Sequence, residues 1–189
     1  MVLTAENITK SYGEKRVLTD FSHTFENGSF TSVMGVSGCG KTTLLSILAG
    51  LVKPDRGRVN PERFQKSMVF QENRLCENLT VAANLRLLHE RPTKAEISAE
   101  LEKLGLSGLE NEPVHTLSGG MKRRAALLRG LLAKYDALFL DEPFKGLDEG
   151  TKRRVMEYCK EKTVGKTVIL VTHDADEAEF FGGEKIILK

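Results

Sequence analysis

The apolar residues fall into short runs separated by polar, glycine-rich or proline-containing stretches. Runs of four to eight residues bounded by turn residues predict strands, and continuous apolar runs are typical of strands buried in a parallel sheet. The expected strands lie at 2–8, 17–22, 29–34, 67–70, 137–142, 167–171 and 184–188. The first two are joined by a turn at 12–15, where Gly13 allows a sharp reversal.

Helical spacing occupies most of the segments between these strands. Apolar residues at intervals of three and four predict helices at 41–49, 122–134 and 149–162, the first ended by Gly50. Segment 72–117 also has helical spacing, interrupted by glycine and proline. We interpret it as a small helical subdomain inserted between core segments 1–71 and 118–189 of one domain, although it could equally continue the layered core.

The strand at 29–34 leads into Gly35-Val36-Ser37-Gly38-Cys39-Gly40-Lys41-Thr42 and then into a helix. This G-x-x-x-x-G-K-[ST] pattern is a P-loop, whose glycines turn backbone N–H groups toward a phosphate chain at the positive end of a helix. Lys41 is expected to reach the β- and γ-phosphates, and Thr42 to hold Mg²⁺. The sequence thus predicts an α/β P-loop NTPase. Its expected nucleotide-binding residues are Ser37, Gly38, Cys39, Gly40, Lys41, Thr42 and Thr43.

Three further strands end in polar residues. Gln71 follows the strand at 67–70, Asp141 and Glu142 end the strand at 137–142, and His173 follows the strand at 167–171. Ligands bind at the carboxyl edge of open α/β sheets, which makes these residues candidates for the site. In P-loop proteins a carboxylate at such a strand end suits magnesium, which fits Asp141, and Glu142 is the candidate base for a water.

Two other motifs carry weaker predictions. Ser118 is a candidate helix cap ahead of Gly119 and Gly120, whose N–H groups could bind an anion. The basic run 122–124 is interpreted as a solvated helix face without function. Tyr12, beside a flexible glycine, could stack on a purine base, although most turn tyrosines are only surface residues.

The amino-acid composition narrows the possible classes of protein. The chain has 189 residues, 40% hydrophobic and 29% charged, which suits one globular domain. No apolar run approaches the roughly 20 residues that span a bilayer, and the first ten residues lack a secretory signal, so we expect a cytoplasmic protein. A net charge of +2 does not suggest nucleic acid as a partner. Cys39, Cys76 and Cys159 are too scattered for a disulfide framework or a zinc site.

Taken together, the motifs resemble those of the ATP-binding cassette (ABC) ATPases, in the family's order and over essentially the whole chain. They are Tyr12, the P-loop 35–42, Gln71, Leu117-Ser118-Gly119-Gly120-Met121, Asp141-Glu142, Leu147-Asp148 and His173. The resemblance implies a mainly parallel core sheet, an N-terminal antiparallel β subdomain and a helical insert. It also implies roles for individual residues: Tyr12 stacks on adenine, Gln71 senses Mg²⁺ and the attacking water, Glu142 is the catalytic base and His173 contacts the γ-phosphate.

The resemblance further implies a homodimer in which Ser118, Gly119 and Gly120 of one subunit complete the ATP site of the other. A two-fold head-to-tail pair is the expected form. Three features depart from the family pattern. Met121 replaces a common Gln, Lys145-Gly146 replace a common Ser-Ala before the dimer loop, and the chain is short, so we expect a minimal cassette without regulatory domains.

Segment 71–84 is similar to that of importer subunits of the nitrate, sulfonate and taurine type. The leading hypothesis is therefore an ATP-hydrolysing subunit, peripheral on the inner face of the membrane, that drives a separate permease. The alternatives are a soluble cassette that remodels ribosomes or DNA, and a non-hydrolysing regulatory cassette. Because a permease needs an apolar docking site, we expect at least one of Leu75, Leu79 and Val81 to be exposed.

Overall fold

The structure, a computed structural model, describes residues 2–61, 65–88 and 92–189. It divides into two compact units. The first contains Met1–Met68, Tyr135–Glu142 and Val164–Lys189, and the second contains Val69–Lys134 and Pro143–Thr163. The segment 72–117 lies inside the second unit, which also takes in helices that the sequence analysis placed in the core. Its status as a separate subdomain remains a prediction.

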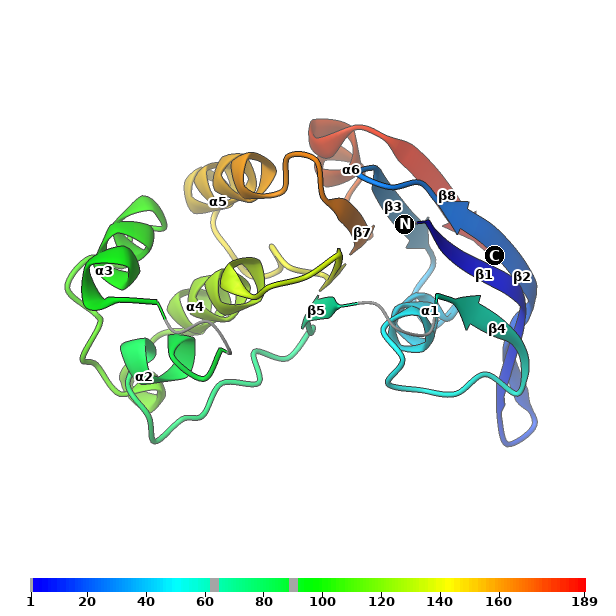
Figure 1. The fold of residues 1–189 in the computed structure, drawn as a ribbon, viewed down its shortest axis with the longest axis horizontal. Coiled ribbons are helices and arrows are strands. Elements are labelled where there is room, and N and C mark those ends of the chain that lie inside the picture. Colours follow the sequence, from blue (N-terminus) through cyan, green and yellow to red (C-terminus); the bar gives the residue numbers. More distant parts are fainter. Residues whose placement is uncertain (1, 62–64, 89–91) are drawn as a thin grey trace. The chain divides into compact units, whose positions relative to one another are not determined.

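Two sheets and two helices form the first unit (Figure 1). The smaller sheet has the order β2-β1-β4 and is antiparallel; the larger has the order β5-β6-β7-β3-β8, and its β3/β7, β3/β8 and β6/β7 pairs are parallel. The elements are β1 (Leu3–Tyr12), β2 (Lys15–Phe25), β3 (Phe30–Gly35), α1 (Lys41–Leu48), β4 (Arg56–Asn60), β5 (Lys66–Val69), β6 (Ala137–Asp141), β7 (Thr167–Val171), α6 (Ala175–Phe181) and β8 (Glu184–Leu188).

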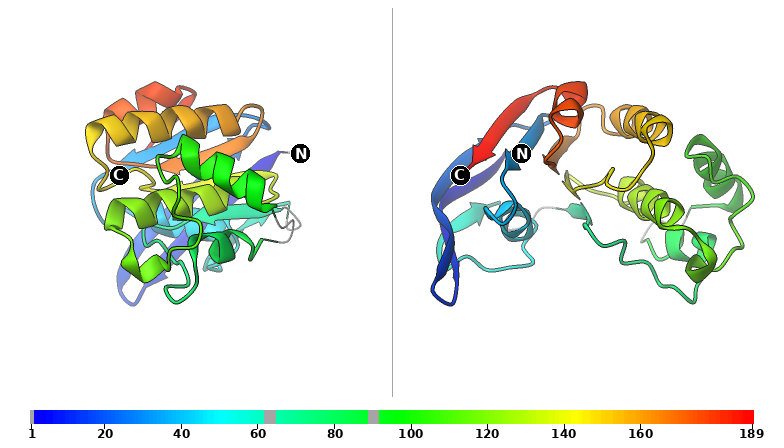
Figure 2. Two further views of the ribbon diagram at one scale, coloured as in Figure 1. Left: turned by 90° about the vertical axis from the view of Figure 1, so that its left-hand side faces the viewer. Right: turned by 180° about the vertical axis from the view of Figure 1, so that it is seen from behind.

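Helix α1 is held in the core by apolar contacts with both sheets. Its four large apolar residues, Leu44, Leu45, Ile47 and Leu48, are at most 2% exposed and join one cluster with residues of β1, β2, β3, β6 and β7. Burying each such side chain contributes about 1.5–3 kcal/mol. Figure 2 shows β2 beside β8. His23 on β2 forms an ion pair with Glu184 on β8. The start of α1 is thereby fixed against the parallel sheet.

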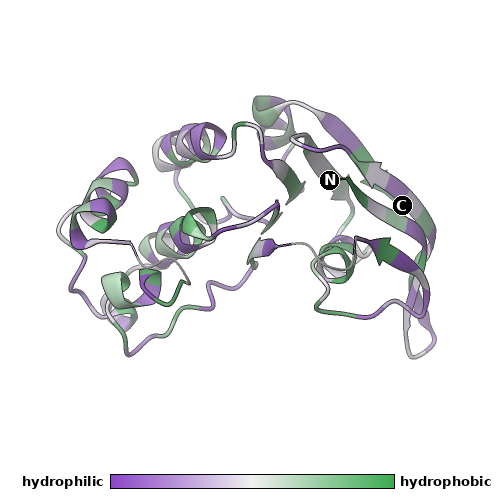
Figure 3. Cartoon of the chain, viewed as in Figure 1, coloured by the Kyte–Doolittle hydropathy of each residue, from purple (hydrophilic) through white to green (hydrophobic). Residues whose placement is uncertain are grey.

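Most of the expected elements are present. Strands β7 and β8 have the predicted bounds, and β6 ends at Asp141, one residue before the expected Glu142, because each is a compact apolar run with a clear end. Strand β5, in contrast, alternates buried and partly buried residues, so the burial on both faces expected at 67–70 is wrong. The sequence analysis also missed two elements: β4, whose residues Arg-Gly-Arg-Val-Asn are exposed or only partly buried, and α6. In the hydropathy colouring the strands of the first unit mix hydrophilic and hydrophobic stretches; β8, for example, has the sequence Glu-Lys-Ile-Ile-Leu (Figure 3).

The second unit is built from helices: α2 (Val81–Leu85), α3 (Lys94–Lys103), the 3₁₀ turn η1 (Val114–Thr116), α4 (Gly119–Leu132) and α5 (Glu149–Lys162). Thr93 and Glu96 form a reciprocal capping box at the start of α3, and Asp148 caps α5. The predicted cap of α4 is confirmed, since Ser118 Oγ accepts from the N–H of Met121 at 3.3 Å. No described helix has the length and apolar character needed to cross a bilayer.

A polar cluster joins α3 to α5 within the second unit. Glu100 accepts hydrogen bonds from the Tyr158 hydroxyl and, at 2.7 Å, from Lys162 Nζ. Burial alone would raise the pKa of Glu100, but the hydrogen bonds from Lys162, Tyr158 and Lys103 together hold this pKa below its usual value. Burial and the Glu100 carboxylate raise the pKa of Tyr158. Both groups therefore keep their hydrogen-bonding forms at neutral pH, and the two helices stay linked.

The basic run 122–124 was wrongly predicted to be a solvated face. Arg123 is 4% exposed, and Lys122 and Arg124 are partly buried. Arg124 Nη1 donates to the carbonyl of Leu104 at 2.7 Å, and Lys122 Nζ lies 2.9 Å from Glu77 Oε1. A charge run read in sequence cannot reveal these partners, because they come from segments far away in the chain.

Candidate functional site

The P-loop lies between β3 and α1, as predicted. Gly35 ends β3 and Gly40 caps α1 with a φ of 103°, a left-handed backbone angle that favours glycine. A Cβ at Gly40 would stand 2.8 Å from the carbonyl oxygen of Val17, and one at Gly35 would stand 2.4 Å from that of Leu188. Neither position has room for a side chain, so these two glycines let the loop curl tightly against its neighbours.

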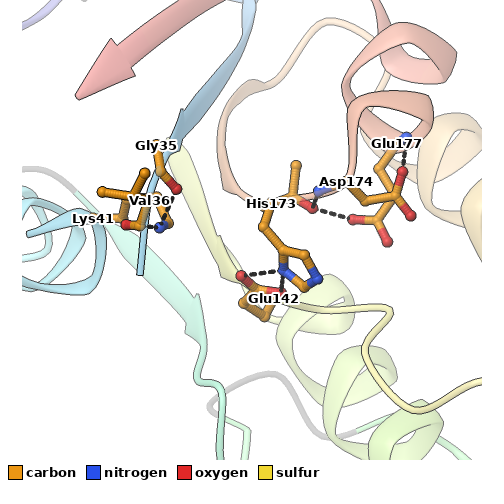
Figure 4. A network of polar contacts seen from close by, with 8 residues as sticks. Gly35, Val36, Lys41, Glu142, His173, Asp174 and Glu177 are labelled. Carbon is orange, nitrogen blue, oxygen red and sulfur yellow. Dashed lines mark hydrogen bonds and ion pairs between the residues drawn. The ribbon is translucent and has the colours of Figure 1, made fainter. Parts of the chain in front are cut away.

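Lys41 points back into this loop. Its Nζ donates to the carbonyl oxygens of Gly35 at 2.7 Å and Val36 at 2.9 Å, and the residue is nearly buried (Figure 4). These bonds keep the ammonium group on the inside of the loop. The hydroxyl-bearing residues Ser37 and Thr42 are exposed, and Thr43 and Cys39 are partly buried. The loop therefore presents a cation, hydroxyl groups and backbone N–H groups together, a set of donors suited to a phosphate chain.

Asp141 and Glu142 stand where β6 ends. Asp141 is buried as the last residue of the strand. Glu142 adopts a φ of 49°, unusual for any residue with a β-carbon, while its N–H donates to the carbonyl of Val171 at 2.9 Å. Such backbone conformations cost about 1–3 kcal/mol and concentrate at functional sites. The sharp turn separates the directions of two adjacent carboxylates, so they need not share one role.

His173 and Glu142 are in direct contact. His173 Nδ1 lies 2.7 Å and 2.9 Å from the two carboxylate oxygens of Glu142 (Figure 4). An ionised carboxylate only accepts hydrogen bonds, so the proton of this bond belongs to Nδ1 and Nε2 remains available for another partner. The imidazole side chain is 65% exposed and that of Glu142 only 12%. The pair thus combines a sheltered carboxylate with an accessible ring nitrogen.

The segment after β7 holds His173 in place. The N–H of Thr172 donates to the carbonyl of Val33 at 3.3 Å, and its hydroxyl donates to the buried Glu177 at 2.6 Å. The N–H of Asp174 donates to that same hydroxyl at 3.0 Å, and the Asp174 carboxylate caps α6. His173 therefore sits between two anchored residues, and α6, which sequence reasoning missed, supplies one anchor.

Tyr12 ends β1 with its side chain accessible, since the residue is 53% exposed. Across the hairpin it pairs with Lys15, a residue that sequence reasoning missed. Lys15 Nζ lies 3.8 Å from the point where a Cβ of Gly38 would stand, which adds a second cation beside the P-loop. Its position opposite Tyr12 in a tight hairpin was the signal available in the sequence.

The remaining predicted residues belong to the second unit. Gln71 follows β5 with an exposed side chain, and Ser118 with Gly119 and Gly120 opens α4. The structure thus gathers Tyr12, the P-loop, Asp141, Glu142 and His173 within one unit and gathers Gln71 with the Ser118–Gly120 segment in the other. No cluster of three or more His, Cys, Asp or Glu residues suited to a metal occurs in the described part of the chain.

Comparisons with known proteins give consistent results. The family model described as ABC transporter matches residues 18–145. The taurine import ATP-binding protein TauB of Pelagibacter ubique is 39% identical over 87% of this chain and 68% of that protein. The aliphatic sulfonates import ATP-binding protein SsuB 3 of Paraburkholderia xenovorans is 41% identical over 94% and 73%. The spermidine/putrescine import ATP-binding protein PotA of Mesoplasma florum is 34% identical over 94% and 56%.

Solved structures match the whole fold. The dimeric structure of MJ0796, a bacterial ABC transporter cassette, has a TM-score of 0.87 and 30% sequence identity, covering 99% of this chain and 94% of that one. A dimeric post-hydrolysis state of the same cassette, bound to ADP and Pi, matches with the same score, identity and coverage.

Proposed function

Because the chain belongs to the ABC transporter family of ATP-binding ATPases, we propose that it is the ATP-hydrolysing subunit of an importer and drives a separate membrane permease. The observation that carries this proposal is the contact between Glu142 and His173, in the same unit as the P-loop. A cassette that only bound nucleotide would need the loop but not a sheltered carboxylate paired with a histidine.

Each residue then has a defined task. The P-loop N–H groups and Lys41 bind the phosphates, and Tyr12 stacks on the adenine. Glu142 accepts the proton of the attacking water, and the exposed imidazole of His173 approaches the γ-phosphate. Preorganised hydrogen bonds of this kind act most strongly where charge develops in the transition state.

Hard oxygen donors suit Mg²⁺, and the chain offers the Thr42 hydroxyl, the Asp141 carboxylate and the Gln71 amide. Thr42 is exposed at the start of α1 and Asp141 is a buried carboxylate at a strand end of the same unit, and these two oxygen donors would hold the cation. Bound there, Mg²⁺ would neutralise charge on the β- and γ-phosphates. The Gln71 amide, at the end of β5, would be a further oxygen donor.

The dimeric cassette structures support a homodimer. We propose that in this homodimer residues 117–121 of one subunit, the signature segment, complete the ATP site of the other. Ser118 is exposed and caps α4, and a Cβ at Gly119 would have no atom within 4 Å. The glycine N–H groups of this segment would bind the γ-phosphate held by the partner's P-loop. The departures at Met121 and Lys145-Gly146 remove none of the N–H groups that this contact needs.

Permease docking is assigned to a groove in the second unit. Its volume is about 700 Å³, and a helical turn about 10 Å across and 5.4 Å long takes up roughly 400 Å³, so the groove fits one to two turns of helix. Leu79 is 38% exposed and lines it, which confirms that one of the three predicted side chains is accessible; Val81 is buried. The groove is lined by Leu79, Thr80, Ala82, Ala83, Arg86, Leu87, Lys94, Ala95, Ile97, Ser98, Glu110 and Asn111.

The cargo does not follow from this chain. Relatives of similar identity are named for the import of taurine and aliphatic sulfonates, which carry a sulfonate group, and of spermidine and putrescine, which are cationic polyamines. We infer that cassettes this similar serve chemically different substrates, so that the permease or a binding protein selects the cargo.

The proposal is tested by replacing Leu79 with Asp and purifying the tagged chain from solubilised membranes of its source cells. We expect the variant to fold and bind ATP but to lose a multi-span membrane protein that the unmodified chain retains. Leu51→Asp is the matched control, since Leu51 is also an exposed leucine but belongs to the first unit. Recovery of ribosomes or DNA in place of a membrane protein would support the soluble alternative.

A further inference from the structure

Arg123 is a buried cation on the signature helix α4. Only 4% of the residue is exposed, and arginine is almost never so buried unless its donors are paired. Its guanidinium donates to three backbone carbonyls: Nη1 to Phe70 at 2.5 Å and to Gln71 at 3.2 Å, and Nε to Pro143 at 2.8 Å. All four residues lie in the second unit.

These carbonyls belong to the two segments that carry the proposed water-sensing and catalytic residues. Phe70 and Gln71 are where the chain leaves β5, and Pro143 directly follows Glu142. Arg123 itself lies five residues after Ser118, about one and a half turns into α4. One side chain therefore connects the first turns of α4 to the backbone of Gln71 and of Pro143, the residue that follows Glu142 in the chain.

We propose that Arg123 is a positioning residue for ATP hydrolysis, which fixes the backbone of Gln71 and of Pro143 relative to the signature helix. The inference rests on the proposed function. The proposed action is indirect: Arg123 works through Gln71 and through the turn after Glu142. When a partner subunit's nucleotide engages the Ser118–Gly120 segment, movement of α4 is carried through this guanidinium to both segments.

Arginine is suited to this task for a geometric reason. Its five N–H donors lie in one rigid plane, so three carbonyls can be held in one fixed arrangement. Lysine keeps the charge but presents it as a single mobile point, and glutamine can donate to two carbonyls at most. Displacement of a catalytic group by about 1 Å can cost up to roughly 100-fold in rate. Small shifts in the position of Gln71 or of the turn after Glu142 should therefore give a measurable loss of rate.

The test compares Arg123→Gln and Arg123→Lys in the purified chain, with Lys122→Gln as the matched control. Lys122 is the neighbouring cation and lies against Glu77 instead of a site segment. We expect Arg123→Gln to lower kcat at least about tenfold while the Kd for ATP changes less than about twofold, since the P-loop is in the other unit. Arg123→Lys is expected to recover part of this loss, and Lys122→Gln to keep the unmodified rate.

A purely structural role for Arg123 would change the melting temperature but leave kcat per folded molecule intact, and that result would overturn the inference. If Arg123→Gln does not fold, the kcat of Arg123→Lys decides: a reduced kcat supports the inference and a normal kcat overturns it.

Action through Gln71 can be tested with a double variant. If Arg123 acts through Gln71, Arg123→Gln should lower the rate less in a Gln71→Ala background than in the unmodified chain. Equal losses in both backgrounds would overturn the Gln71 part of the inference.

Failure of the proposed function can be distinguished from failure of the inference about Arg123. An unmodified chain without ATPase activity would overturn the proposed function and this inference with it. An active unmodified chain with an equally active, folded Arg123→Gln variant would overturn only the inference.

Discussion

Replacing Glu142 with glutamine separates the proposed chemistry from the stability of the fold. Glutamine keeps the size of the side chain, and its amide oxygen can still accept the Nδ1–H of His173, but it cannot take a proton from water. Losing a general base typically slows a reaction by about 10²–10⁴-fold, which corresponds to about 2.7–5.4 kcal/mol in the barrier. We therefore expect hydrolysis to fall by at least 100-fold.

Stability should change much less. The imidazole of His173 is largely exposed and glutamine can keep a hydrogen bond to it, so the substitution should cost no more than about 1 kcal/mol, the net value of one hydrogen bond. The φ of 49° costs the same for both residues, because each has a β-carbon. A loss of 1 kcal/mol lowers the melting temperature of a chain this size by about 2–4 °C.

The assay is phosphate release by the purified chain at saturating Mg-ATP, with calorimetric ATP binding and a thermal melt on the same samples. Glu179→Gln is the matched control, since Glu179 is an exposed carboxylate on α6. Glu142→Gln is expected to bind ATP normally and to melt within a few degrees of the unmodified chain. Turnover within about threefold of the unmodified rate would refute the assignment of Glu142 as the base.

Three further variants or measurements test other parts of the site. Lys41→Ala should weaken ATP binding itself by about 10- to 150-fold, the value of a hydrogen bond to a charged group; unchanged affinity in calorimetry would contradict the phosphate role. Ser118→Arg, made together with Glu142→Gln, should leave nucleotide binding intact but prevent the ATP-dependent dimer on a sizing column, whereas Ser118→Asn keeps the helix cap and serves as its control. Burial raises the pKa of the Cys159 thiol to about 12, so we expect alkylation at Cys76 in the native chain and at Cys159 only after unfolding; rapid native labelling of Cys159 would contradict the packing of α5.

The sequence predicted the strands and helices whose ends carry strong local signals. The P-loop, β6, β7 and α5 all combine an apolar or capped segment with a glycine, proline or aspartate at a boundary. The polar strand β4 was missed because its pairing with β1, not its own residues, defines it. Helix α6 could have been predicted from the sequence, because Asp174 is a good helix cap and Ala178 and Phe181 are apolar residues at a helical interval.

The site itself was only partly predictable. Strand-end residues could be listed from the sequence, but the contact of Glu142 with His173 depends on β6 pairing with β7, which the sequence order does not state. Arg123 was misread for a related reason. Its burial depends on backbone carbonyls of the residues that follow β5 and β6. Every residue has a backbone carbonyl, so the sequence does not show which ones will accept a hydrogen bond.

The central claim is that this chain powers a membrane permease by hydrolysing ATP. Its most direct test is the ATPase rate of the complex purified from source membranes, measured for the unmodified chain and for Glu142→Gln and Leu79→Asp. The account predicts that the unmodified chain and Glu142→Gln both retain a multi-span membrane protein, that only the former complex hydrolyses ATP, and that Leu79→Asp retains no such protein. Equal hydrolysis by the Glu142→Gln complex, or no membrane protein with any of the three, would contradict it.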